Sequence, residues 1–440
     1  MMPAAPGIAA SQASESLHAA AQAGARRLSA PPRTRKRVAY IMSRFPKLTE
    51  TFILYEMLAV DRQGVDVEVF PLARERTKFI HPEAAALVAR AHFWPLVSLK
   101  ILWAHLYFLF HKPKAYFAAL GTLLWANLGS LRYFGGAVLY FPKIVRFAYE
   151  MKALNVDHVH AHFASHPAAA AFVIHRLTGI PYSFTAHGSD LHRDRHMLRE
   201  KVAEAAFVAT ISDYNRRLIL EHCGSNYADQ VCVVHCGVDP DFFTASPSAV
   251  ASRGTPRVLC IGTLHEVKGQ TYLIEAARLL ADRGTPVECH FVGDGPDLPA
   301  LTAQADKASL PCRPIFHGRK TRDEVKQLLG EADIVVAPSV PTSDGRREGI
   351  PVVLIEAMAA GVPVVASRLS GIPELVEHEH TGLLAPPRDA KALADEIARL
   401  VENLPLRRRL AAAGRDRVMR QFNLEQSAST LSDWFGGSRG

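Results

Sequence analysis

Short apolar runs alternate with segments of helical periodicity along nearly the whole chain. In the first half, the apolar runs predict strands at 38–42, 65–72, 156–163, 181–186, 206–211 and 231–234. In the second half, they predict strands at 257–261, 287–292, 315–318, 333–337, 362–367 and 382–385. Helical periodicity predicts helices at 53–63, 168–177, 272–282, 390–403, 406–422 and 424–434. This alternation is typical of parallel sheets with crossover helices, so we predict an α/β protein with two sheet domains.

Changes of composition set the predicted domain limits. Residues 1–37 are rich in Ala, Ser and Pro and end in a basic run, which favours a disordered leader over a transit peptide. The first domain is predicted at 38–240, and a linker rich in Ser, Ala and Pro at 241–256. The second domain is predicted at 257–422, followed at 423–440 by a terminal helix and tail.

Residues 93–147 interrupt this pattern with a cluster of aromatic side chains. Their apolar stretches are broken by Lys, Arg and His residues, and the uncharged segment 115–131 is at the short limit for spanning a bilayer. The pattern favours buried helices of the first domain. A membrane-surface patch is the main alternative, and a true membrane span is the third.

Composition narrows the function classes. The chain has 440 residues, 48% of them hydrophobic, and a net charge of +8, which suits anionic substrates or an anionic membrane surface. No aromatic and basic residues interleave as they do in RNA-binding modules, so no nucleic-acid partner is expected. Six scattered cysteines match no disulfide scaffold and no common zinc spacing, which indicates a reducing, cytoplasmic compartment.

One stretch of the second half holds most of the candidate ligand-binding residues. The strand predicted at 333–337 runs into a polar loop and then into a helix, with Pro351 near its start and Gly361 placed to end it. Glu348 lies just before this helix and Glu356 lies within it. A helix N-terminus suits a phosphate, and two carboxylates suit hydroxyl groups. A ligand that combines both groups is a sugar nucleotide.

Polar residues also follow the predicted strands of the first half, where parallel sheets bind ligands. Arg44 and Glu50 follow the first strand, and His187, with Gly188 after it, follows the fourth. The residues His158, His160 and His162 alternate along one face of another strand. With no carboxylate in register, these three favour a structural or hydrogen-bonding role over a metal site.

Two glycine-containing loops follow strands of the second half. One is the segment 262–269, which carries Lys268, and the other is Gly293-Asp294-Gly295-Pro296. The second loop lacks a third glycine at the dinucleotide spacing, so nicotinamide binding is not supported.

Several of these segments resemble one known family. The run Glu348-Gly349-Ile350-Pro351, followed by 356–361 and 363–365, resembles the signature of family 4 retaining glycosyltransferases, with two glutamates eight positions apart. The loop 262–269, the pair His187-Gly188 with Asp190, the triplet 237–239 and the turn 293–296 also match. The segment 45–52 resembles the subgroup that builds bacterial exopolysaccharides, including colanic-acid-type enzymes. The likeness covers roughly 38–422, and five ordered blocks are far more specific than a lone glutamate pair.

The resemblance implies a GT-B fold, with two Rossmann-like domains facing across a cleft and the terminal helix crossing back to the first domain. It implies transfer of a sugar, with retention, from a nucleotide-diphosphate sugar to a glycan or lipid-linked oligosaccharide. UDP is favoured on frequency alone. The nucleotide sugar is a substrate, so no cofactor is expected, and no metal. The expected place is the cytoplasm, with the inner face of the cytoplasmic membrane as its finer form.

The resemblance also implies roles for individual residues. Lys268, the loop around Gly262 and the backbone N–H groups of Gly349 and Ile350 are expected to bind the diphosphate. Glu348 and His187 would contact the donor sugar, and Glu356 the ribose hydroxyls. These donor-side and catalytic residues are His187, Gly262, Thr263, Lys268, Gly293, Gly295, Glu348, Gly349, Ile350 and Glu356. On the acceptor side we expect Arg44, Glu50 and Asp190.

At Thr263 the chain departs from the family, which usually has an arginine five positions before the lysine. Arg319, Arg346 and Arg347 are the candidates to replace it. The departure keeps a non-catalytic sugar-nucleotide-binding protein open as an alternative, and donor binding without turnover would favour it. A sugar-nucleotide epimerase of the same fold is a second alternative, which would convert the donor without an acceptor.

Overall fold

The computed structural model describes residues 35–47, 50–76, 82–244 and 254–437. Most of the predicted leader and much of the predicted linker lie outside these ranges. The first strand already begins at Arg37, the last residue of the predicted leader.

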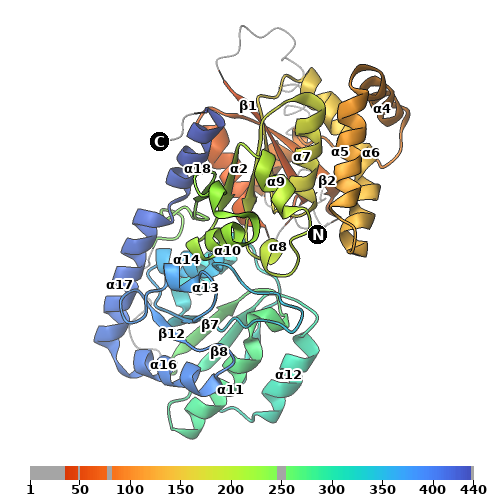
Figure 1. The fold of residues 1–440 in the computed structure, drawn as a ribbon. Coiled ribbons are helices and arrows are strands. Elements are labelled where there is room, and N and C mark those ends of the chain that lie inside the picture. Colours follow the sequence, from red (N-terminus) through yellow and green to blue (C-terminus); the bar gives the residue numbers. More distant parts are fainter. Residues whose placement is uncertain (1–34, 48–49, 77–81, 245–253, 438–440) are drawn as a thin grey trace, which may run out of the picture. The chain divides into compact units, whose positions relative to one another are not determined.

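Two six-stranded sheets, each with only parallel pairings, form the centre of residues 37–440 (Figure 1). The strands of the first sheet are β1 (Arg37–Phe45), β2 (Asp66–Arg74), β3 (His158–His162), β4 (Tyr182–Ala186), β5 (Phe207–Thr210) and β6 (Val231–Val233). The strands of the second are β7 (Arg257–Ile261), β8 (Glu288–Val292), β9 (Ile315–Phe316), β10 (Ile334–Ala337), β11 (Val364–Ser367) and β12 (Leu383–Ala385). Their orders are β2-β1-β3-β4-β5-β6 and β12-β11-β10-β7-β8-β9, which confirms the predicted α/β class with two sheets.

Helices cover both faces of each sheet, because strands that are buried on both sides need two apolar layers. The helices that follow strands of the first sheet are α2 (Thr51–Arg62), α3 (Ala85–Ala89), α4 (Leu99–His111), α5 (Pro113–Trp125), α6 (Leu131–Ala153), α7 (His166–Thr178), α8 (Ser189–His192), α9 (Leu198–Glu204) and α10 (Asp213–Cys223). Those of the second are α11 (Gln270–Asp282), α12 (Leu298–Lys307), α13 (Arg322–Glu331), α14 (Val352–Ala359), α15 (Ile372–Leu375), α16 (Ala390–Glu402) and α17 (Leu404–Gln421). Strands β3, β4, β5, β10, β11 and β12 are buried at every position.

The last helix, α18 (Leu424–Phe435), packs on the first sheet. The chain passes from α17 into α18 beside Val238, whose N–H donates to the carbonyl of Phe422 and whose carbonyl accepts from Leu424. Gly237 allows this approach, because a Cβ there would lie 2.4 Å from the Cα of Leu424. The buried side of α18 then joins the apolar cluster formed by β1 and α2.

Helices α4, α5 and α6 account for the aromatic region, and they lie together on the flank next to α7, away from α18 (Figure 1). Their inner faces are buried, as at Ile101, Phe108 and Phe141. Their outer faces expose many large apolar side chains, so the prediction of fully buried helices is wrong for that side. In the part of the chain that the structure describes, no helix combines the length and the apolar character needed to cross a membrane.

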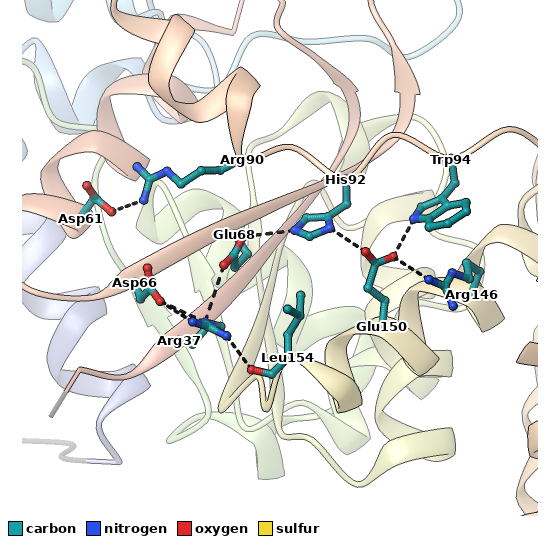
Figure 2. Close-up of polar contacts among 10 residues, drawn as sticks. All are labelled: Arg37, Asp61, Asp66, Glu68, Arg90, His92, Trp94, Arg146, Glu150 and Leu154. Atoms are coloured by element: carbon teal, nitrogen blue, oxygen red, sulfur yellow. Dashed lines mark hydrogen bonds and ion pairs between the residues drawn. The ribbon is translucent and has the colours of Figure 1, made fainter. Parts of the chain in front are cut away.

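A polar network attaches α6 to the edge of the first sheet (Figure 2). The ring of His92 lies between two carboxylates, 3.1 Å from Glu68 on β2 and 2.8 Å from Glu150 on α6. Glu150 also accepts from the indole N–H of Trp94 at 2.6 Å. The two carboxylates outweigh partial burial and raise the pKa of His92 to about 9. At neutral pH a charged histidine therefore joins the strand, the helix and the start of the aromatic region.

The same network contains the first residue of β1. Arg37 donates to Asp66 at 3.0 and 2.9 Å and to the carbonyl of Leu154 at 2.7 Å (Figure 2). Arg90, beside His92, pairs with Asp61 at 2.9 Å. The basic run at the end of the predicted leader thus ends in a residue that belongs to the folded part.

Candidate functional site

Glycines shape the loops that follow β7 and β8. A Cβ at Gly293 would lie 2.0 Å from the carbonyl oxygen of Gly262, and one at Gly295 would lie 2.2 Å from that of Leu264. The backbone N–H of Leu264 donates to the carbonyl of Asp294 at 3.1 Å. The two glycine loops noted in the sequence are therefore locked together, and only glycine fits at these two contact points.

Lys268 extends across the first of these loops. Its aliphatic stem runs 3.2 Å from the place that a Cβ on Gly262 would occupy. Its ammonium lies 2.7 Å from a carboxylate oxygen of Glu348, and both side chains are about one-fifth exposed. Lysine and glutamate come from loops eighty positions apart in the chain, so the structure brings two of the predicted residues into direct contact.

The segment after Glu348 contacts the turn at the end of β4. A Cβ on Gly349 would lie 2.6 Å from the carbonyl oxygen of His187, and one on Gly188 would lie 3.3 Å from the Cα of Gly349. Gly188 has a φ of +129°, a value that side chains rarely adopt. The next residue, Ile350, is buried. The predicted donor stretch and the predicted His-Gly turn therefore lie backbone against backbone.

A chain of buried polar groups lies beneath His187. Its Nε2 is 3.0 Å from Nδ1 of His162, whose Nε2 is 3.1 Å from a carboxylate oxygen of Glu56. The hydroxyl of Tyr40 donates to the same oxygen at 3.3 Å. Because a carboxylate only accepts, His162 donates to Glu56. On the other side of the ring, the Nδ1 of His187 faces the sulfur of Cys236 at 3.9 Å.

Burial lowers the pKa of His187 well below its usual value, and the neighbouring His162 adds to this effect. The imidazole is therefore neutral at physiological pH. The residue as a whole is 8% exposed. Phe52 and Phe163 pack on the ring, with centroids 4.8 and 4.7 Å away. This environment holds His187 in one orientation.

No carboxylate lies in register with the strand histidines, as the sequence indicated, but another element brings one to them. Glu56 comes from α2, so it could not be seen in the register of β3. Ligand atoms of Glu56, His160 and His162 lie within 4.8 Å of one another, which a metal ion could bridge. The two nitrogens of His160 are nevertheless 2.8 Å from Ser183 and 3.0 Å from Thr185. The hydrogen-bonding role favoured from the sequence accounts for these contacts.

Asp190, expected on the acceptor side, lies under the turn that carries His187. Its carboxylate accepts from the backbone N–H of Ala164 at 2.6 Å, of His187 at 3.1 Å and of Gly188 at 2.8 Å. Burial raises the pKa of Asp190, and these hydrogen bonds oppose the rise. The geometry gives Asp190 a role in holding the turn, and a contact with an acceptor stays a prediction.

Glu356 lies on α14, in a narrow crevice lined by Thr51, Tyr55, Val238 and Arg322. Burial raises the pKa of Glu356 to about 7, and the charge of Arg322 lowers it only in part. Among the described residues, no hydrogen bond reaches this carboxylate. The guanidinium of Arg322 lies over the rings of Phe242 and Tyr55, at 3.7 and 4.0 Å, and was not foreseen from the sequence.

The remaining predicted residues lie at the edges of this region. Arg44 is 60% exposed and 3.7 Å from Glu75, and Glu50 pairs with Lys47 at the start of α2. Thr263 is exposed, and its carbonyl accepts from Gln270 at 3.1 Å.

The three candidate replacements for the missing arginine differ in position. Arg346 lies 3.4 Å from Nε2 of His265, inside the loop that carries Lys268. Arg319 pairs at 3.4 Å with Asp294 of the second glycine loop. Arg347 instead reaches the hydroxyl of Tyr214 on α10, at 3.3 Å.

One contact between the two sheets' loops was missed altogether. The carboxylate of Glu374, on α15, accepts from the backbone N–H groups of Asp213 and Tyr214, both at 2.7 Å. These groups form the free N-terminus of α10, which favours a negative partner. The Gly-Ile-Pro-Glu run at 371–374 was visible in the sequence, but nothing local indicates which helix it contacts.

Comparisons with known proteins show the family to which the chain belongs. Two family models match in succession, "Glycosyltransferase Family 4" over residues 124–242 and "Glycosyl transferases group 1" over residues 243–417. The amylovoran biosynthesis glycosyltransferase AmsK of Erwinia amylovora is 32% identical over 88% of this chain and 96% of its own. WcaL of Escherichia coli K12, whose name assigns it to colanic acid biosynthesis, is 30% identical over 82% and 90%. The chain belongs to glycosyltransferase family 4.

Solved structures show the fold of this family 4 glycosyltransferase. HepE of Anabaena, in complex with UDP, superimposes with a TM-score of 0.69 over 92% of this chain and all of that one, at 18% identity. The sucrose-phosphate synthase of Thermosynechococcus elongatus gives 0.67 over 92% and 99%, at 20% identity. The predicted GT-B fold is thereby confirmed, and the protein is a glycosyltransferase.

Proposed function

We propose that the protein transfers a sugar from UDP-sugar, with retention, to a growing glycan or lipid-linked oligosaccharide in exopolysaccharide synthesis. The observation that supports this most is the pairing of Lys268 with Glu348 next to the contact of Gly349 with the His187–Gly188 turn. Lys268 and Glu348 therefore lie next to the backbone turn that carries His187, whose ring is held by its own neighbours. The AmsK and WcaL names support the polysaccharide context.

The chemistry explains why a cation is needed there. Breaking the bond between the anomeric carbon and the phosphate places negative charge on the leaving diphosphate and positive character on the sugar. In this proposal Lys268 leaves Glu348 and pairs with the diphosphate. The N–H groups of Gly349 and Ile350, just before α14, add their dipoles. Glu348 is then free to accept hydrogen bonds from the donor sugar.

Glu356 is proposed to bind the ribose hydroxyls. A half-buried carboxylate with no hydrogen-bond partner among the described residues, and with its pKa raised to about 7, gains two hydrogen bonds when a diol replaces water. Arg346 is proposed as the second cation in place of the residue at Thr263, because it already contacts the loop of Lys268. Gly262, Gly293 and Gly295 are proposed to let the phosphates approach the backbone.

The acceptor side is assigned to the loops of the first sheet. We place Arg44 and Glu50 near the acceptor, and His187 over the donor sugar. A lipid-linked acceptor implies work at the cytoplasmic side of a membrane. UDP is preferred because HepE was solved with it, although other relatives are named for GDP-mannose.

The test is a thermal-shift screen of the purified protein against UDP-, GDP- and ADP-sugars, followed by turnover assays with the sugar that stabilises it. We expect stabilisation by a UDP-sugar, and a product whose anomeric configuration, read by proton NMR, matches the donor. Stabilisation by GDP-sugars alone would overturn the choice of UDP. An inverted product would overturn retention, and binding without turnover over all acceptors would contradict the transfer itself.

A further inference from the structure

The outer face of α4–α6 exposes a concentrated apolar surface. Of the fourteen large apolar side chains exposed in the described part of the chain, thirteen lie between residues 96 and 139. Val97, Leu99, Phe110, Trp125 and Leu131 are each at least 78% exposed. Contiguous apolar surface of this kind marks a site of interaction.

Helix α4 shows that this surface is not a consequence of loose packing. Its residues Ile101, Ala104 and Phe108 are buried against the rest of the protein. Its opposite side carries a second apolar stripe, at 99, 102, 103, 106 and 110, which is exposed and follows helical spacing. A helix that is apolar on both sides needs a second apolar partner outside the described structure.

The charge around the patch is of one sign. From residue 84 to residue 149 the chain has seven Lys and Arg residues and no Asp or Glu. Among these cations, Lys100, Lys112, Lys114 and Arg132 are exposed. Long basic side chains can keep their charge in water beside buried apolar groups, and they attract anionic headgroups.

We propose that this face docks the protein onto an anionic phospholipid surface. A second copy of the chain fits less well, because a two-fold contact would place cations against cations with no carboxylate to compensate. The helices would lie in the interface rather than cross it, since none is long and apolar enough to span. Docking on a membrane would bring the protein to a lipid-linked acceptor, and this part of the inference rests on the proposed function.

The patch is held firmly and continues toward the candidate site. The network of His92 and Glu150 fixes α6, and the guanidinium of Arg146 lies 4.3 Å from the ring centre of Trp94, at the start of the patch. At the other end, the ring of Tyr133 stacks on His196, with centroids 5.5 Å apart. The loop before His196 carries Arg193, which is 3.5 Å from Asp344 of the second sheet's donor loop. Contacts therefore run from α6 to the loop that precedes Glu348.

The experiment is co-sedimentation of the full chain with vesicles of phosphatidylcholine alone or with about one-third phosphatidylglycerol. We expect binding to the anionic vesicles, and a loss of affinity of about tenfold or more in V97S/L99S/F110S/L131S. The matched control is Ile315→Ser, which removes the one exposed large apolar side chain found elsewhere in the described residues. It should bind as the wild type does.

A second pair of variants tests the charge. Lys112→Glu with Lys114→Glu should weaken binding to anionic vesicles by about tenfold, whereas Lys391→Glu with Arg408→Glu, on α16 and α17, should not. Unchanged binding in both patch variants would overturn the proposal. So would a dimer in analytical ultracentrifugation that the apolar variant dissociates, without any vesicle binding. Thermal stabilisation by UDP-sugar, measured in every variant, separates this outcome from failure of the proposed function and from misfolding.

Discussion

The two sheets have the same number of strands and the same parallel pairing. The side chains that their loops bring together nevertheless differ in exposure and charge. The second sheet brings Lys268 and Glu348, both partly exposed and paired only with each other in the contacts that the structure describes. The first brings His187, which is neutral, nearly buried and held by Glu56 through His162. In the proposed function, Lys268 exchanges Glu348 for the ligand, whereas His187 is already held in place before the ligand binds. We propose that the site combines a charge that changes partner, on Lys268, with an imidazole that stays in place, on His187.

The largest expected effect is the loss of transfer when the charge of Lys268 is removed. Lys268→Ala removes the cation that we propose pairs with the leaving diphosphate, and transfer should fall by about a thousandfold. Turnover of the purified variant, with a saturating donor, gives the measurement. Lys391→Ala is the control, because that lysine is exposed on α16. A Lys268→Ala enzyme within tenfold of the wild type would show that the charge is not used as we propose.

The contact between the two sides can be broken with a single methyl group. In Gly349→Ala the new Cβ would lie 2.6 Å from the carbonyl of His187, so the loop must move away from the turn. We expect a loss of activity of about ten- to hundredfold, because displacement of about 1 Å is costly to positioning. Gly330→Ala is the matched control, since no atom lies within 4 Å of a Cβ there. Equal activity of the two variants would remove this contact from the account.

The fixed position of His187 is tested by substitutions of Glu56, which holds His187 through His162. Glu56→Ala leaves the buried N–H of His162 and the hydroxyl of Tyr40 without their acceptor, which should cost about 2 kcal/mol of stability and release His187. Transfer should fall by about tenfold. Glu56→Gln keeps an acceptor oxygen in the same place and should stay within a few-fold of the wild type. If alanine and glutamine behave alike in urea unfolding and in turnover, the buried chain of groups has no positioning role.

The smallest expected effect on transfer is that of His92, far from the candidate site, where the change is one of stability. Its folded pKa of about 9 exceeds the ordinary value of 6.5, so its stabilising contribution is complete below pH 6.5 and is lost as the pH rises through 9. The size is at most about 3 kcal/mol. In urea unfolding, His92→Gln should be less stable than the wild type at pH 7, and the difference should shrink at pH 10. His380→Gln, on an exposed loop, should show no such change, and a difference for His92→Gln that is constant with pH would contradict the ion pair.

The same comparison explains what could be predicted from the sequence. The strands of the second sheet were all found, because each is a short apolar run bounded by glycine or proline. Its candidate site residues could also be predicted, since glycine loops and paired glutamates are local patterns. Several helices were missed, namely α3, α8, α9, α10, α12, α13 and α15. For α13 a usable signal existed in the capping box of Thr321 and Glu324.

The contacts of the first sheet could not be derived in the same way. His162 and Glu56 lie 106 positions apart, and no sequence pattern near either residue predicts their contact. Similarly, the periodicity of α4 predicts that one side is buried but does not say which of its two apolar sides. Packing decides both questions, because it depends on elements that are distant in the sequence. The buried histidine chain and the exposed helical face therefore emerged only from the fold.

The most direct test of the central claim is the affinity for UDP of the wild type, Lys268→Ala and Lys391→Ala, measured by isothermal titration calorimetry. If Lys268 and the loops around it form the diphosphate site, Lys268→Ala should bind UDP at least about tenfold more weakly, since a hydrogen bond to a charged group contributes roughly 1.5–3 kcal/mol. Lys391→Ala should bind as the wild type does. Equal affinities in all three proteins would contradict the assignment of the site.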